Sequence, residues 1–249
     1  MIHVQNVAFS YGKSAEILKD ISFDLEQGHF LALLGNNGAG KSTLLKCING
    51  ILHRSGGVIL VGERDVSQMR RNEIARTMAY VEQSNEASQF TVYDAVLMGR
   101  KPFIRVNPTK EDIAIAEQAM ARMELQDFAL RYIDQLSGGE LQKVVIAWAL
   151  AQQPKILLLD EPTSNLDLHN QHEVMHIMQE ISQHDGIAVI VVIHDLNLAL
   201  RYCDRFLLMQ DGLVYNYGDN SVITDRSIYD VYHIRAGVTE IGGRKYVLV

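Results

Sequence analysis

Cysteines, long apolar runs and excess positive charge are all scarce in this chain of 249 residues. Its two cysteines, Cys47 and Cys203, are too few and too far apart for a disulfide scaffold or a zinc knuckle, so we expect buried free thiols. The longest apolar runs, such as residues 187–193, have the length of a strand and fall well short of the roughly 20 residues that a membrane helix needs. We therefore expect that the chain does not cross a bilayer on its own.

The net charge and the start of the sequence indicate which partners and which cellular location to expect. The formal net charge is −7, which argues against nucleic acid as a partner, because a protein that binds nucleic acid needs a basic face. The sequence does not open with a basic segment followed by an apolar one, as secretory signals do, so we expect a cytosolic location. The length suits one large domain or two small ones.

A glycine-rich segment with the pattern of a nucleotide-binding P-loop follows the apolar run 30–34 and precedes an apolar helix start. The segment consists of Gly35, Asn36, Asn37, Gly38, Ala39, Gly40, Lys41, Ser42 and Thr43. Glycines let backbone N–H groups turn inward, and the helix N-terminus adds positive potential, so the loop suits a polyphosphate. We expect Lys41 to bridge the β- and γ-phosphates, Ser42 to ligate Mg²⁺ and Thr43 to lie on the α-phosphate side. The alternative is a glycine-rich turn without a ligand.

The apolar run 156–159 ends in two acidic residues, Asp160 and Glu161. Ligands of α/β sheets collect at the carboxyl ends of the strands, which places these carboxylates beside the P-loop. We expect Asp160 to hold Mg²⁺ through its water shell, and Glu161 to orient or deprotonate an attacking water. A pair of acids that merely ends a strand in solvent is the alternative.

A second candidate anion site lies at Ser137, Gly138 and Gly139, which open a helix that continues to Ala151. Backbone N–H groups at a helix N-terminus attract anions by the same dipole argument. Taken alone, the segment fits an ordinary N-cap equally well.

The hydrophobic pattern predicts an α/β fold. We expect a P-loop NTPase core, a mostly parallel sheet with flanking helices, preceded by an antiparallel β-layer and interrupted by an inserted helical subdomain. Expected strands are 2–9, 17–25, 30–34, 58–61, 78–81, 155–159, 188–193 and 206–209, with a terminal hairpin over 238–249. Thr109 and Asp112 form an expected capping pair. We expect one ATP-binding domain over 1–249, its core formed by 1–90 and 154–249 and its helical subdomain by about 91–153.

Together, the P-loop, the acidic strand end and the segment 136–140 resemble the motifs of ATP-binding cassette (ABC) ATPases, and the resemblance covers essentially the whole chain. It implies four further roles. Tyr11 would stack on adenine, although core packing explains a lone tyrosine as well. Gln83 would touch Mg²⁺ and the attacking water, and Asp167 would lie in a loop at the dimer interface. His194 would contact the γ-phosphate, although a lone histidine at a strand end is often structural.

The resemblance also implies cofactors and partners. In that family, ATP and Mg²⁺ are held between the P-loop of one copy and the serine–glycine segment of a second copy, so ATP closes a homodimer and hydrolysis reopens it. The stretches 91–100, 164–168, 194–199, 202–204 and 231–232 are similar to ATPases of iron-siderophore, haem and cobalamin importers. This group implies transmembrane permease subunits, indirectly a substrate-binding protein, and a place at the cytoplasmic face of the membrane. Phe90, Val92 and Tyr93 would contact the permease, and the cargo stays open.

The sequence leaves three alternatives for the function of the whole chain. They are an ABC transporter for another cargo such as a metal ion, a soluble ABC-type ATPase acting on ribosomes or DNA, and a P-loop kinase or GTPase.

The histidines His169, His172 and His176 fall on one helical face and fit either a metal site or a solvated face. We expect the basic pairs 70–71 and 100–101 to be solvated.

Overall fold

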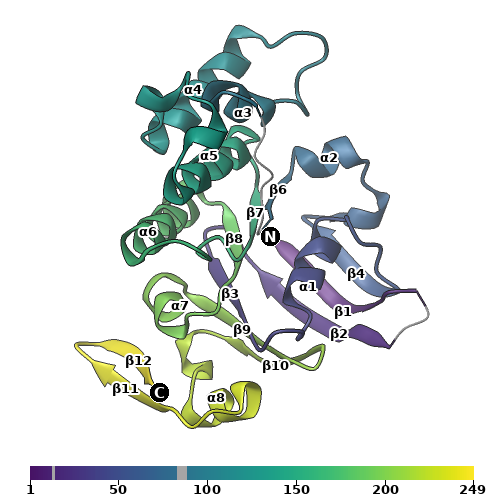
Figure 1. Ribbon diagram of the computed structural model, residues 1–249. Coiled ribbons are helices and arrows are strands. Elements are labelled where there is room, and N and C mark those ends of the chain that lie inside the picture. Colours follow the sequence, from purple (N-terminus) through teal and green to yellow (C-terminus); the bar gives the residue numbers. More distant parts are fainter. Residues whose placement is uncertain (13–14, 83–88) are drawn as a thin grey trace.

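A six-stranded sheet forms the centre of the fold in the computed structural model, which describes residues 1–12, 15–82 and 89–249 (Figure 1). Its strands, in spatial order, are β10 (Leu213–Gly218), β9 (Arg205–Gln210), β3 (Phe30–Leu34), β8 (Ala188–Val192), β7 (Ile156–Asp160) and β6 (Met78–Val81). All run parallel except β10, which pairs antiparallel with β9. The five parallel strands confirm the predicted mostly parallel sheet. The edge strand β10 was not predicted, because all six of its residues are at least partly exposed and give no apolar run.

All five residues of β3 are buried, alternately on the two faces of the sheet, which explains why its sequence is apolar throughout. Phe30, Ala32 and Leu34 join one buried cluster with the helices α6 (Leu168–Asp185) and α7 (Leu196–Tyr202). Leu31 and Leu33 join the other, with α1 (Lys41–Ile48) and the antiparallel sheet. A strand covered on both faces has no polar side, as is typical of parallel sheets. The strand thus positions the loop that follows it between two packed layers.

The predicted antiparallel β-layer is confirmed. Its strand order is β2 (Glu16–Leu25), β1 (Ile2–Ser10), β4 (Gly56–Val61) and β5 (Arg64–Asp65). The short helix α2 (Arg71–Ala75) follows it. Short 3₁₀ turns cover Val66–Gln68, Gln126–Phe128, Ile133–Gln135 and Asn220–Val222.

Helices dominate the region from residue 92 to 151, as predicted. They are α3 (Val92–Met98), α4 (Lys110–Arg122) and α5 (Gly138–Ala151), which contact one another and gather at one end of the sheet (Figure 1). The predicted capping pair is confirmed, since the Thr109 hydroxyl accepts the Asp112 N–H and the Asp112 carboxylate accepts the Thr109 N–H. One buried cluster runs from these helices into the sheet. The division into core and subdomain therefore stays a prediction.

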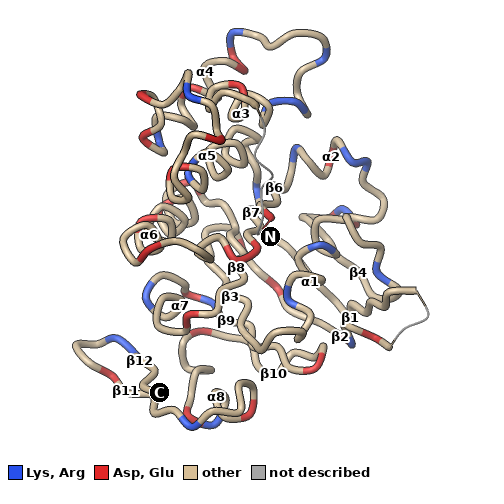
Figure 2. The backbone as a smooth tube through the Cα atoms, in the orientation of Figure 1, with Lys and Arg blue, Asp and Glu red and all other residues tan. Residues whose placement is uncertain are grey.

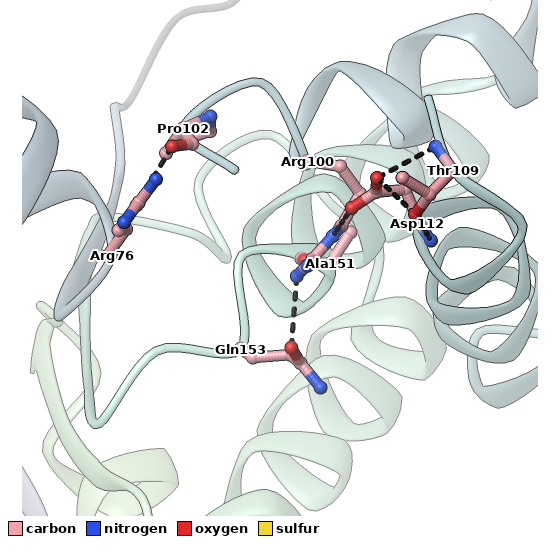
Figure 3. Close-up of polar contacts among 7 residues, drawn as sticks. All are labelled: Arg76, Arg100, Pro102, Thr109, Asp112, Ala151 and Gln153. Carbon is pink, nitrogen blue, oxygen red and sulfur yellow. Dashed lines mark hydrogen bonds and ion pairs between the residues drawn. The ribbon is translucent and has the colours of Figure 1, made fainter. Parts of the chain in front are cut away.

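Arg100 lies at the base of these helices, and the prediction that it is solvated was wrong. Its side chain is buried and pairs with Asp112 at 3.0 Å (Figure 3). It also donates to the backbone oxygen of Ala151 at 2.8 Å and to the side chain of Gln153 at 3.0 Å. A guanidinium tolerates burial when its donors are paired in this way. The other residues of the two basic pairs are exposed: Arg70, Arg71 and Lys101.

The carboxyl-terminal segment forms α8 (Asp225–Tyr232) and the predicted hairpin of β11 (Gly237–Ile241) and β12 (Arg244–Leu248). The hairpin is tied to α7, since the Asn197 side chain exchanges two hydrogen bonds with the backbone of Val247. The cysteines are buried and free, as expected. Along the described chain, acidic and basic residues are interspersed (Figure 2), and no helix in it is long and apolar enough to span a bilayer.

Candidate active site

The loop between β3 and α1 has a backbone that only glycine tolerates at key points. Gly35, Gly38 and Gly40 have φ angles of 146°, 83° and 97°. An added Cβ on Gly35 would lie 2.3 Å from the backbone oxygen of Met209, and one on Gly40 would lie 2.8 Å from Leu18 Cδ2. The glycines are therefore required by geometry, which holds the loop open at the amino end of α1.

Lys41 lies inside this loop. Its side-chain nitrogen Nζ donates to the backbone oxygens of Gly35 at 2.7 Å and Asn36 at 3.0 Å. Burial lowers the pKa of Lys41, while the nearby charges of Glu161 and Asp160 act in the opposite direction. A buried ammonium held by two carbonyl oxygens is well placed to exchange them for phosphate oxygens.

Asp160 and Tyr80 are buried and form a hydrogen-bonded group with the half-buried Ser42, which follows Lys41. Ser42 Oγ donates to Asp160 Oδ1 at 2.8 Å, and the Tyr80 hydroxyl donates to Asp160 Oδ2 at 3.2 Å. Burial and the charge of Asp160 raise the pKa of Tyr80, so its phenol stays protonated. Hydroxyl and carboxylate oxygens are the donors that Mg²⁺ prefers, so the set fits that ion. The sequence prediction missed Tyr80, although a hydroxyl near the carboxyl end of a predicted strand was a usable signal.

Glu161 and His194 meet at the same edge of the sheet. They follow the neighbouring parallel strands β7 and β8, and Glu161 Oε1 lies 2.7 Å from His194 Nε2. The Glu161 side chain is 19% exposed and that of His194 46% exposed, so both can reach a ligand from the protein surface. Glu161 has a positive φ of 52°, a strained value for this residue type and one that is common at functional sites.

The segment at Ser137 lies at the amino end of α5 and is capped by its own chain. The Ser137 hydroxyl accepts the Glu140 N–H at 3.3 Å, and the Glu140 carboxylate accepts the Ser137 N–H at 2.7 Å. A Cβ on Gly139 would lie 2.7 Å from the side chain of Asn170, whose N–H is capped by Asp167. The structure thus brings the serine–glycine segment and Asp167 together at the start of α6.

The P-loop (35–43) and the serine–glycine segment (137–139) lie apart within one chain. Helix α1 lies on one face of the sheet, whereas α6 lies on the other with the start of α5 beside it (Figure 1). Among the described residues, no hydrogen bond or ion pair joins 35–43 to 137–139. Tyr11 is 49% exposed and packs edge-on against Phe9, while Gln83 lies outside the described residues. In the rest of the loop, Asn36, Asn37 and Gly38 are exposed, Ala39 is buried and Thr43 is half-buried.

Comparison with known proteins decides the family. Residues 18–164 match the family model described as ABC transporter, which is more than half of the chain. The chain belongs to the ABC transporter family. It is an ABC ATPase, as its sequence predicts.

Curated relatives of this ABC ATPase support the assignment. An uncharacterized ABC transporter ATP-binding protein of Methanocaldococcus jannaschii is 49% identical over 98% of this chain and 95% of its own length. The cobalamin import ATP-binding protein of Halobacterium salinarum is 40% identical over 89% of this chain, which spans only 56% of that relative. The hemin import ATP-binding protein of Shewanella denitrificans is 38% identical over 95% of this chain and 94% of its own length.

Solved structures have the same fold. A chain from an ABC transporter assigned to the metal-chelate type, in an inward-facing conformation, has a TM-score of 0.86 and 30% identity over 99% of this chain and 95% of its own. A dimeric ATP-binding cassette bound to ADP and Pi has a TM-score of 0.76 and 28% identity over 88% of this chain and 98% of its own. The predicted fold class is confirmed by these likenesses.

The surface of this ABC ATPase also has a groove of about 1270 Å³ between the antiparallel layer and the helices α3 and α5. Ile51, Met69, Met98 and Trp148 are among its lining residues. The prediction that Val92 is free to contact a partner was wrong, because it faces inward from the first turn of α3 and is fully buried.

The histidines of α6 separate from one another. His172 Nδ1 lies 2.9 Å from the Tyr202 hydroxyl, whereas His169 and His176 are exposed. In residues 1–12, 15–82 and 89–249, no cluster of three or more metal-ligating side chains is found. His169 and His176 therefore fit the solvated-face interpretation, whereas His172 is half-buried against Tyr202.

Proposed function

We propose that this ABC ATPase powers an importer for an iron chelate, haem or cobalamin. The observation that carries the proposal is the gathering of Lys41, the Ser42–Asp160 pair and the Glu161–His194 pair at one edge of the sheet. The named cargoes of two relatives and the metal-chelate type of the structural neighbour support this class of cargo. The identity of the cargo within it depends on proteins other than this chain.

The proposed site binds ATP through the P-loop. Backbone N–H groups of the loop and the charge of Lys41 would hold the β- and γ-phosphates, and Tyr11 would pack against the adenine. Ser42 and Asp160 would hold Mg²⁺, with Gln83 as a further ligand. When bound, that ion supplies positive charge that neutralises the phosphate oxygens.

Hydrolysis needs a water aligned with the γ-phosphate. Glu161 would accept its proton or orient it, and His194 would donate a hydrogen bond to the γ-phosphate. The short contact between these two side chains keeps both at the strand edge, and each has solvent access.

A second copy would complete the site. The segment Ser137–Gly139 lies away from the P-loop of its own chain, so we propose that it meets the γ-phosphate held by a partner copy, with Asp167 at the interface. The dimeric cassette with ADP and Pi supports this arrangement. Loss of the γ-phosphate then removes the charge that holds the halves together.

The groove beside α3 suits a membrane partner. We propose that a helix of a transmembrane permease lies in it against Ile51, Met98 and Trp148, which would keep the ATPase at the cytoplasmic face of the membrane. A substrate-binding protein would then act through the permease alone. We also propose that the core (1–90 and 154–249) and the helical subdomain (about 91–153) are two bodies, and that the permease helix contacts both.

The experiment uses Glu161→Gln. We expect hydrolysis to fall by about 100-fold or more because the attacking water loses its base, whereas ATP binding is retained. The variant should form a dimer with ATP on a sizing column. When the variant is expressed together with a permease from the same organism, it should also retain that polytopic membrane protein during purification with ATP.

Glu180→Gln, an exposed carboxylate on α6, is the matched control and should behave as the wild type. Hydrolysis by Glu161→Gln at the wild-type rate would reject the role of Glu161. If the variant purifies without any polytopic partner from a strain that expresses the permease, the proposed role in a transporter is rejected.

A further inference from the structure

Helix α8 touches the start of the P-loop at two points. The backbone N–H of Gly35 donates to the hydroxyl of Tyr232 at 2.9 Å. The side-chain amide of Asn36 donates to the backbone oxygen of Val231 at 2.8 Å. These residues are almost 200 positions apart in the chain, so the contact is made only by the folded protein.

Gly35 is held from both sides. Its N–H meets Tyr232, and its carbonyl oxygen accepts the ammonium of Lys41 at 2.7 Å. Gly35 is buried, and a buried N–H without a partner is costly, so the phenol oxygen has a defined task as its acceptor. Burial raises the pKa of Tyr232 to about 12, which keeps the phenol neutral at working pH.

We propose that Tyr232 is a positioning residue for nucleotide binding, because its hydroxyl fixes Gly35 while Lys41 turns from the loop carbonyls to the phosphates. The inference rests on the proposed binding of ATP at this loop. When Lys41 leaves the oxygens of Gly35 and Asn36, the loop loses its internal brace. The contacts from α8 then hold the same two residues in the shape that receives the polyphosphate.

Helix α8 (Asp225–Tyr232) lies outside residues 18–164, which the family model matches. The carboxyl-terminal segment therefore contributes to the nucleotide site from outside the matched region. A side chain placed there can act on the affinity for nucleotide without touching the reacting atoms.

The test compares Tyr232→Phe with Tyr229→Phe. The first removes only the acceptor of the Gly35 N–H, and we expect the KM for ATP to rise about tenfold with kcat within about twofold of the wild type. Tyr229 lies on the same helix and is 53% exposed, so its variant should keep both parameters. A purely structural role would instead lower the amount of folded enzyme, and hence kcat, with the KM unchanged.

Hydrogen exchange on the nucleotide-free protein gives a second readout that does not need turnover. In Tyr232→Phe, the peptide that covers 31–41 should exchange faster, while a peptide over β7 keeps the wild-type rate. An unchanged KM together with unchanged exchange would overturn the role of Tyr232. Binding of a fluorescent ATP analogue to the wild type separates the two levels: if the wild type does not bind it, the proposed function fails, and if both proteins bind it equally, only this inference fails.

Discussion

Two helices of this chain begin at glycine-bearing segments, and their amino ends are built differently. Helix α1 starts after Gly40, and no side chain of the described residues caps it. Helix α5 starts after Ser137, which forms a capping box with Glu140. The first helix end therefore has free backbone donors, whereas the second has some of its donors satisfied by its own chain.

The difference indicates two tasks for two similar motifs. An uncapped N-terminus attracts an anion strongly, so α1 is the end that we propose to hold a phosphate in a single copy. The end of α5 already carries a carboxylate, and the hydrogen bonds from Ser137 lower the pKa of Glu140 so that it stays charged. Such an end adds less attraction, which suits a partner that closes on a nucleotide and later releases it.

The largest expected effect comes from blocking the capped end. Ser137→Arg should reduce hydrolysis by about 100-fold, because the long side chain keeps the second copy from the γ-phosphate, while ATP still binds to the P-loop. The same loss is expected for Lys41→Ala, which removes the phosphate contact instead.

Mixing these two variants makes the test decisive. One composite site of a mixed dimer would contain both an intact P-loop and an intact serine–glycine segment, so activity should return on mixing. A mixture as inactive as its parts would contradict a site shared between two copies.

A smaller effect is expected at the uncapped end. Gly40→Ala places a methyl group 2.8 Å from Leu18 Cδ2 and 3.2 Å from the backbone oxygen of Ile17 at a φ of 97°, so the loop or the Leu18 side chain must shift. We expect the affinity for ATP to fall about tenfold, measured by titration with a fluorescent analogue. Gly243→Ala is the control, since its φ of 77° is also positive, and it has open space around it in the turn between β11 and β12. Equal losses in both variants would mean that strain alone, and not the shape of this helix end, sets the affinity.

Sequence alone predicted the parts of the site that are local. The P-loop lies within nine consecutive residues, and Asp160 and Glu161 follow a buried run, so each motif appears as a pattern of neighbours. The parallel strands are fully buried and give continuous apolar runs, which is why they were predicted correctly.

The contacts that were missed depend on distant residues. Tyr80 reaches Asp160 across neighbouring strands, and Tyr232 reaches Gly35 from the far end of the chain. Local patterns do not give strand order, so neither contact could be predicted, although the position of Tyr80 near a strand end marked it as a candidate. Arg100 was misjudged for the same reason, because its partner Asp112 lies on the next helix.

The smallest effect should come from the charge at the capped end. Glu140→Gln keeps the size of the side chain and removes its negative charge, which lies beside the amino end of α5. In the Glu161→Gln background, where ATP is not consumed, we expect dimerisation at about two- to fivefold lower ATP concentration, because less repulsion opposes the phosphate. Sizing chromatography across an ATP series measures this, with Glu117→Gln on α4 as an exposed control. Weaker dimerisation would mean that the capping box itself, rather than relief from its charge, shapes the surface that closes on the nucleotide.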